Sequence, residues 1–326
     1  MNITDSHLHL SDLSQNDFSF IDDIFSVDGV DKYLFCTSSH SLSDYNMTCQ
    51  LIKNIYSKYD ISNVKICHSL GIHPQNPDIN MTSLLENVLK YEKYDIKPDI
   101  KYDKLLTKYD ILQDKYDKNM TNLSKYDIKY DKISAIGECG FDLFTDEYKS
   151  TFAEQNELWN AQLELAIKYD KPIIVHCRKG MCHIFESIEK LKKIKAVIFH
   201  SFSGSVTEAI SLRKKGVNAF FSFGKPILNG NKNAIQCVKS LPIDWLLLET
   251  DSPYQTLKGE SFTSPTDILK VYAQFVKLRK EENEIISNQD GILKESSILN
   301  QLNQIFTEEN FNLINAISEN FCKLIN

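Results

Sequence analysis

The chain has 326 residues, of which 42% are hydrophobic and 25% charged, as is ordinary for a globular protein with a substantial core. Its formal net charge of −7 argues against a protein that coats nucleic acid electrostatically. No apolar stretch approaches the roughly 20 residues that span a bilayer, and the first residues lack the basic and apolar segments of a signal peptide. We therefore expect a cytoplasmic protein outside the membrane.

Short apolar or β-branched runs alternate with amphipathic stretches through most of the chain. The runs lie near residues 3–7, 33–37, 64–70, 133–138, 172–177, 195–200, 218–223 and 245–250. Between two of them, in 151–169, Phe152, Leu158 and Leu163 recur at near-helical spacing. Strands that alternate with helices predict a parallel sheet, and eight of them favour a single-domain α/β barrel of the TIM type, a (β/α)8 barrel.

One segment interrupts this alternation. Between residues 93 and 131 the tripeptide Lys-Tyr-Asp occurs six times. We expect an insertion at about 90–132 that is helical or partly disordered and has no catalytic part. A short heptad-like seam that begins at Tyr102 leaves open a helix packed on the barrel or on a second subunit. The tail from about 265 to 326 is expected to form helices.

The eight cysteines form no Cys-x-x-Cys pair and mostly lie in apolar segments. This pattern favours reduced cytosolic thiols over a disulfide framework. Cys139 and Cys177 adjoin candidate metal ligands, but strand alternation points them to the opposite face. We therefore do not expect either thiol to bind metal.

Six residues that suit metal binding sit at the ends of apolar runs, where barrel strands converge on one mouth. They are His7, His9, Glu138, His176, His200 and Asp251. The His-x-His pair near the amino terminus places both imidazoles on one face of a strand, so they can chelate one ion. Four histidines and two carboxylates exceed the needs of a single ion, so the set indicates two ions and a metal-dependent hydrolase.

The two carboxylates carry separate expectations. Glu138 stands between two glycines, which leaves room for its two oxygens to bridge two cations. Asp251 points to the same face as Glu249, and we expect Asp251 to be the ligand while Glu249 orients a histidine. We expect Asp142 to cap a helix.

Further polar residues follow the histidine strands and fit a phosphate. Arg178 offers a guanidinium, and Ser203 begins a loop with exposed amides around Gly204. We also expect Lys225 to steady the phosphate. His73, in Gly-Ile-His-Pro, is expected to bind substrate or to donate a proton to the leaving group, with a structural role as the open alternative.

Six segments resemble the ordered motifs of the TatD-type metal-dependent deoxyribonucleases of the amidohydrolase superfamily. They read DSHLHL, GIHP, IGECGFD, PIIVHCR, HSFSG and LETDSPY, and they cover residues 4 to about 256 apart from the insertion. The resemblance implies a TIM-type barrel with two divalent ions, Mg²⁺, Mn²⁺ or Zn²⁺. The ligands that it implies are His7, His9, Glu138 and Asp251 for one ion, and Glu138, His176 and His200 for the other.

The resemblance also implies the activity. We expect a DNase, a phosphodiesterase that acts as a 3′–5′ exonuclease on single-stranded DNA or 3′ ends, with two ions activating water and Asp251 accepting its proton. No membrane and no obligate protein partner is implied. Two alternatives stay open: a hydrolase of a small-molecule ester, lactone or amide with the same metals, and a non-catalytic interaction protein on an inherited barrel.

Overall fold

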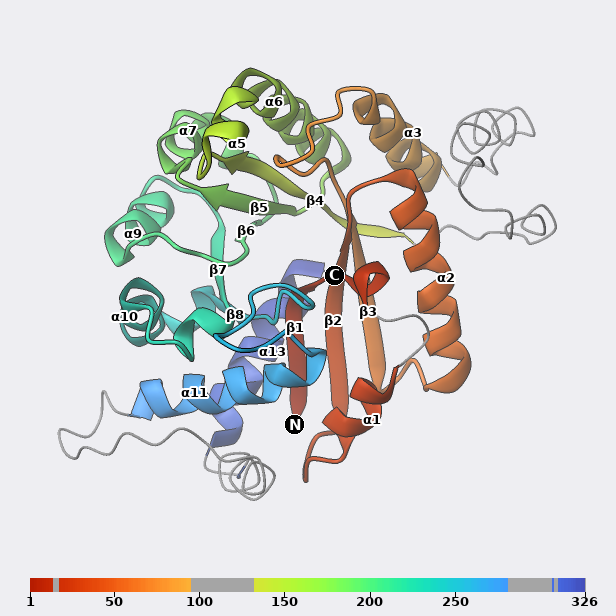
Figure 1. The fold of residues 1–326 in the computed structure, drawn as a ribbon, viewed down its shortest axis with the longest axis vertical. Coiled ribbons are helices and arrows are strands. Elements are labelled where there is room, and N and C mark those ends of the chain that lie inside the picture. The colour runs from red at the N-terminus through yellow and green to blue at the C-terminus, as the bar shows by residue number, and fades with distance from the viewer. Residues whose placement is uncertain (14–17, 95–131, 281–306, 308–309, 326) are drawn as a thin grey trace.

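Eight parallel strands follow one another around a barrel in chain order in the computed structural model (Figure 1). The structure describes residues 1–13, 18–94, 132–280, 307 and 310–325. The strands are β1 Asn2–Leu8, β2 Lys32–Ser39, β3 Val64–Leu70, β4 Ile133–Asp142, β5 Ile173–Arg178, β6 Val197–Phe199, β7 Ala219–Phe223 and β8 Leu246–Leu248. Each matches one of the eight predicted runs, and the predicted α/β barrel is confirmed.

Helices surround the barrel on its outer face (Figure 1). The α-helices are α1 Ser19–Phe25, α2 Leu42–Lys58, α3 Met81–Tyr94, α5 Asp146–Ser150, α6 Phe152–Tyr169, α7 Met181–Glu186, α8 Ile188–Leu191, α9 Val206–Lys214, α10 Lys232–Ser240, α11 Ile268–Lys280 and α13 Phe311–Ile325. Short 3₁₀ helices are η1 Leu10–Asp12, η3 Lys225–Ile227, η4 Ile243–Trp245 and η5 Pro265–Asp267. Within the described part of the chain, no helix combines the length and apolarity needed to cross a bilayer.

The helices of the tail confirm the prediction for residues 268–280 and 311–325. Helix α3 runs into the Lys-Tyr-Asp-rich segment and ends at Tyr94. Residues 95–131, which carry the rest of the insertion and the seam from Tyr102, lie outside the described residues.

A short contact between the first and last strands closes the barrel. Leu8 pairs with Ser252 in a parallel bridge, and the His9 amide donates to the Ser252 carbonyl at 2.8 Å. The Asp251 amide donates to the His7 carbonyl at 2.9 Å. Closure therefore brings the earliest and latest of the predicted ligands side by side.

Buried Asp5 reinforces this closure from within β1. Its carboxylate accepts hydrogen bonds from the Thr250 amide at 3.0 Å, the Thr250 hydroxyl at 2.6 Å and the His7 amide at 3.2 Å. A buried carboxylate must find donors to offset its lost hydration. Asp5 finds them on both strands and so ties β8 to β1 immediately below the site.

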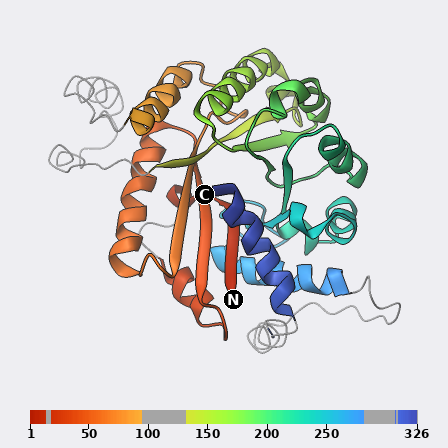
Figure 2. The ribbon, with the colours of Figure 1, turned by 180° about the vertical axis from the view of Figure 1, so that it is seen from behind.

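Side-chain alternation along the strands separates an outer from an inner core. Tyr33 and Phe35 pack outward against the helices. The inner core consists of Leu34, Cys36, Cys67, Ala135, Ile174, Ala196, Ile198, Phe220, Leu247, Phe321 and Leu324. The last two belong to α13, so this helix covers the N-terminal end of the barrel (Figure 2). The mouth at the C-terminal strand ends is the end left for a site.

Five of the eight cysteines lie buried in these cores. All eight are free, and Cys36, Cys49, Cys67, Cys139 and Cys237 are buried. Cys139 belongs to the outer core, on the face away from its neighbour Glu138, as strand alternation predicts.

Close packing of β4 on β5 generates a prediction about Gly140, whose φ is +138°. A Cβ there would overlap the carbonyl oxygen of His176. We expect Gly140→Ala to lower the free energy of unfolding by about 3 kcal/mol or more, because clash and backbone strain act together. Urea denaturation followed by circular dichroism measures the loss.

Gly230→Ala is the matched control. Gly230 also has a positive φ, +79°, but nothing lies within 4 Å of the place where a Cβ would stand. Strain alone should cost about 1–2 kcal/mol there. Equal losses at the two positions would contradict the close approach of β4 to β5.

Candidate metal centre

The six predicted ligands meet at the C-terminal end of the barrel. His7 is the penultimate residue of β1 and His9 follows the strand, Glu138 lies in β4, His176 in β5, His200 after β6 and Asp251 after β8. All six are buried, with at most 8% of each residue exposed. Side chains far apart in the sequence thus share one buried cluster because parallel strands end at the same rim.

Glu138 stands at the centre of this cluster. Its Oε1 lies 2.6 Å from His176 Nδ1, 3.2 Å from His73 Nε2, and in contact with His200 Nε2. Three imidazoles from β5, the loop after β3 and the end of β6 therefore converge on one oxygen.

The second oxygen of Glu138 faces the other side of the barrel. Its Oε2 lies 3.3 Å from His7 Nε2, 3.8 Å from His9 Nε2 and 3.5 Å from His40 Nε2. The two oxygens of Glu138 thus face separate groups of imidazoles, which is the arrangement that a bridging carboxylate needs.

Asp251 completes the β1 side of the cluster. Its Oδ1 lies 3.3 Å from His9 Nε2 and 3.7 Å from His7 Nε2. Its Oδ2 accepts a hydrogen bond from Gln255 Nε2 at 3.0 Å. The backbone of Asp251 is left-handed, with φ 55°, a conformation that aspartate tolerates better than most residues.

Charges in the cluster are tightly linked. Burial alone would raise the pKa of Glu138, but His200, His73 and His176 hold that pKa well below its usual value. Burial likewise opposes protonation of His200, yet Glu138, Glu249 and Asp251 raise its pKa to about 10. Burial and the neighbouring His200 lower the pKa of His7 to about 4. The surrounding carboxylates therefore favour the protonated form of His200.

The donor set fits divalent cations. His7 Nε2, His40 Nε2 and His200 Nδ1 are buried without a hydrogen-bond partner, although such atoms in proteins nearly always have one. His176 Nδ1 and His200 Nε2 lie only 3.2 Å apart. Three overlapping triplets could each hold an ion, namely His7, His200 and Asp251; His7, His9 and Glu138; and His73, Glu138 and His176. Mixed imidazole and carboxylate donors suit Zn²⁺ or Mn²⁺.

Asp142 supports the cluster from the end of β4. Its Oδ2 lies 3.2 Å from His176 Nε2 and 3.4 Å from Arg178 Nη1, and it accepts from Gln75 Nε2 at 2.7 Å. Its Oδ1 accepts from the Phe144 amide at 3.0 Å, so it also caps the turn after the strand. A carboxylate on the far nitrogen of a ligating histidine sets the tautomer and ring orientation.

Glu249 lies beside His200 at the end of β6, as Asp142 lies beside His176. Its Oε1 lies 3.8 Å from His200 Nδ1 and accepts from the amide and hydroxyl of Ser201 at 2.6 and 2.8 Å. Glu249 therefore anchors the residue that follows His200. Ser203, which was expected to contact phosphate, is exposed two residues farther along the loop.

Lys225 follows the C-terminal end of β7 as a paired cation. It is only 1% exposed, and its Nζ lies 2.5 Å from Glu260 Oε2 and 2.6 Å from Asp267 Oδ2. Two carboxylates neutralise its charge, so the expected phosphate contact does not follow from the structure. Arg178, in contrast, stays exposed beside Asp142.

His40 and Gln255 are site residues that sequence reasoning missed. His40 directly follows β2, and its amide donates to Asp44 Oδ2 at 2.7 Å, which fixes the loop. Its position at a strand end was the signal that could have identified it. Gln255 carried no such signal, because its contact with Asp251 depends on the local turn after β8.

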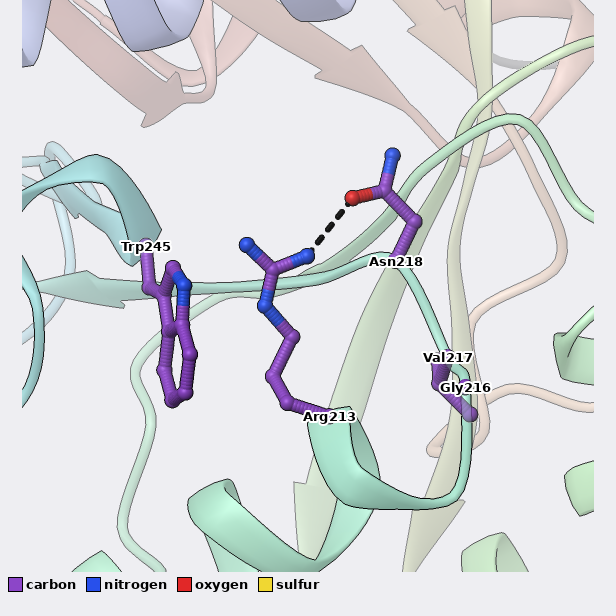
Figure 3. A pocket seen from close by; sticks show the side chains of 5 residues that line it. All are labelled: Arg213, Gly216, Val217, Asn218 and Trp245. Atoms are coloured by element: carbon purple, nitrogen blue, oxygen red, sulfur yellow. Dashed lines mark hydrogen bonds between the residues drawn. The ribbon is translucent and has the colours of Figure 1, made fainter.

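A separate hollow of about 370 Å³ lies at the other end of the strands (Figure 3). Arg213 stands there between Trp245 and Asn218, with its guanidinium carbon 4.8 Å from the indole centroid and Nη1 2.7 Å from Asn218 Oδ1. Asn218 and Trp245 directly precede β7 and β8, whereas the candidate metal ligands lie in the second half of their strands or beyond them, so this hollow is at the opposite end of the strands.

Metal binding should release protons. A cation needs the neutral imidazole of His200, whose pKa is about 10 in the metal-free protein, so binding at pH 7 displaces its proton. We expect the apparent affinity for Mn²⁺ to rise about tenfold per pH unit between pH 6 and 9 for each proton released. Calorimetry in buffers of different ionisation enthalpy measures the release.

His200→Gln provides the comparison, because glutamine has no titrating proton. That variant should bind Mn²⁺ more weakly and with a smaller pH slope. Binding to the wild-type chain that is independent of pH and buffer would contradict the assignment of His200.

Comparison with known proteins identifies the family. A family model described as "TatD related DNase" matches residues 4–290, a range that contains all six candidate ligands. The chain is 34% identical over 158 residues to a TATDN1 homolog of Enterocytozoon bieneusi, covering 48% of this chain and 51% of that protein. It is 33% identical over 156 residues to the metal-dependent hydrolase YjjV of Escherichia coli, covering 46% and 58%. The chain thus spans about half the length of these curated relatives.

Solved structures agree on the fold. The crystal structure of YjjV from Escherichia coli superposes with a TM-score of 0.64 at 21% identity, covering 99% of this chain and 98% of that chain. A TatD family hydrolase from Entamoeba histolytica gives 0.58 at 18% identity, covering 99% and 97%. With the family model matching most of its length and the predicted ligands gathered in one cluster, this chain belongs to the TatD family of metal-dependent hydrolases.

Proposed function

We propose that this chain is a metal-dependent deoxyribonuclease that removes nucleotides from the 3′ ends of DNA. The observation that carries the proposal is the convergence of six of the eight histidines on the buried carboxylate of Glu138. The description of the matching family as DNases supports a phosphodiester substrate.

The two faces of Glu138 suggest how two ions are divided. We assign His7, His9, Glu138 and Asp251 to one ion, and Glu138, His176 and His200 to the other. Two bound ions lower the pKa of a water molecule and neutralise charge on a phosphate. Zn²⁺, Mn²⁺ and Mg²⁺ are all candidates for this set.

Asp251 is the proposed proton acceptor. Burial alone would raise its pKa, but His9 and His200 lower it, so the carboxylate is ionised at neutral pH. The hydrogen bond from Gln255 holds one oxygen, which leaves the other directed at the histidine cluster. A base held in a fixed position is in the correct protonation state before the substrate arrives.

His73, His40 and Arg178 are the proposed phosphate contacts at the rim. The side chains of His73 and His40 are 13% and 27% exposed, more than the side chains of the buried ligands His7 and His9. Arg178 is 44% exposed and held beside Asp142. Positive or hydrogen-bonding groups at this position stabilise the developing charge on a phosphate without being buried themselves. Lys225 is left out of this set because its charge is already paired.

Replacement of Glu138 tests the proposal. We expect Glu138→Ala to lower metal-dependent release of nucleotides from single-stranded DNA by at least ~100-fold, because the bridging carboxylate is removed. Release of labelled mononucleotide measures the rate, and circular dichroism verifies the fold. Chelation of the metal should abolish the activity of the wild-type chain as well.

Glu154→Ala is the matched control, since Glu154 is an exposed carboxylate in the first turn of α6. It should retain the wild-type rate. A Glu138→Ala variant that keeps most of its rate would show that the bridging assignment is wrong. Hydrolysis of small esters or lactones without release of nucleotides would favour the alternative hydrolase.

The Lys-Tyr-Asp-rich insertion is proposed to have no catalytic part. The six candidate ligands belong to β1, β4, β5, β6 and β8 or to the residues that directly follow these strands. A chain without 95–130 should therefore keep measurable metal-dependent hydrolysis. Complete loss of activity in a deletion variant that remains folded would place the insertion in the site.

A further inference from the structure

Exposed aromatic side chains gather at the catalytic mouth. The large hydrophobic residues that stay exposed among the described ones are Ile61, Ile79, Phe144, Tyr254, Phe262 and Phe311. Three of the four rings in this set lie in the loops after β4 and β8, on the side of the mouth. Exposed aromatic rings beside a charged cluster offer faces on which a planar ligand can stack.

Phe144 belongs to the loop after β4. It is 55% exposed, and the guanidinium carbon of Arg178 lies 4.3 Å from its ring centroid. Its amide donates to Asp142, and Asp142 in turn lies 3.2 Å from the ligand His176. The ring and the guanidinium are therefore stacked on each other and held at a defined place beside one side of the metal cluster.

Tyr254 belongs to the loop after β8. It is 51% exposed, and its ring meets the ring of His9 edge to face, with centroids 5.1 Å apart. Its hydroxyl donates to Asp12 Oδ2 at 2.9 Å, and its amide donates to the Asp251 carbonyl at 2.7 Å. This second ring is fixed beside the other side of the cluster while about half of its surface remains open.

The two rings stand on opposite sides of the metal cluster. The strands follow one another around the barrel in chain order, so β4 and β8 are four positions apart in a ring of eight. Phe144 is linked through Asp142 to His176 on β5, whereas Tyr254 meets His9 beside β1. A phosphodiester links two nucleosides, so a scissile phosphate at the cluster places one nucleoside toward each ring.

We propose that Phe144 with Arg178, and Tyr254, are two base-stacking platforms that hold the nucleosides on either side of the scissile phosphate. The proposal rests on the proposed deoxyribonuclease function and names the residues that select its substrate. Every base has a π-face, so such platforms are tolerant of sequence but require bases that are unpaired and free to turn outward. They therefore select single-stranded 3′ ends over duplex DNA.

A double-mutant cycle between ring and base tests the platforms. The probes are a fluorescein-labelled dT12 and two copies of it with an abasic tetrahydrofuran at the last or the next-to-last position. Binding is measured by fluorescence anisotropy in Ca²⁺, with intact DNA verified on a gel, and KM and kcat are measured in Mn²⁺. We expect Phe144→Leu and Tyr254→Leu each to weaken binding of dT12 about tenfold and to raise KM more than they lower kcat.

The abasic probes distinguish base stacking from a structural role, because a structural defect would weaken the binding of all three probes equally. One abasic probe lacks the base that would stack on the replaced ring. On that probe, each Leu variant and the wild-type chain should have dissociation constants within about twofold of each other. Tyr254→Phe keeps the ring without the hydroxyl and should bind dT12 as tightly as the wild-type chain. Phe311→Leu removes an exposed ring on α13, at the other end of the barrel, and should change nothing.

The outcomes separate this inference from the proposed function. Equal weakening of all three probes by a Leu variant, or no weakening of any, would overturn the platforms while the wild-type chain still releases nucleotides. A wild-type chain that releases no nucleotides from dT12 with any divalent ion would overturn the proposed function first, and the platforms with it.

Discussion

The candidate site is organised around one buried carboxylate, that of Glu138, which imidazoles surround. An isolated ionised carboxylate in a protein interior is strongly unfavourable, so it must be paired. Histidines that lie near the ends of five strands supply the pairing, and Glu138 in turn raises the pKa of His200. The same crowding of nitrogens around two oxygens explains why divalent cations fit, since each cation would replace repulsion between imidazoles with shared coordination.

The residues that close the barrel also form the candidate site. The bonds that join β1 to β8 run through the backbones of His7, His9 and Asp251, and Asp5 ties the two strands beneath them. Ligands that bind a cation across this seam stabilise the closed barrel, because a cation that binds only the folded chain shifts the folding equilibrium by mass action. We infer that metal binding and closure of the last strand support each other.

The two ends of the barrel have separate roles. At the N-terminal end, α13 contributes Phe321 and Leu324 to the inner core and covers the strand starts. At the C-terminal end, the strands and the loops that follow them carry the candidate ligands, the rim histidines and the exposed rings Phe144 and Tyr254. The cover of the inner core and the candidate site thus lie at opposite ends of the strands.

Sequence alone determined the eight strands and pointed to the six candidate ligands. An apolar run predicts a strand, and the polar residues at its end predict where that strand reaches the rim. Parallel barrel strands all end at a common mouth. Only the tertiary structure decided the rest. It turned His40 toward Glu138, paired Lys225 with Glu260 and Asp267, and placed Phe144 and Tyr254 on opposite sides of the cluster. These placements depend on where loops fold back and which partner a charge meets. Neither is set by local spacing along the chain.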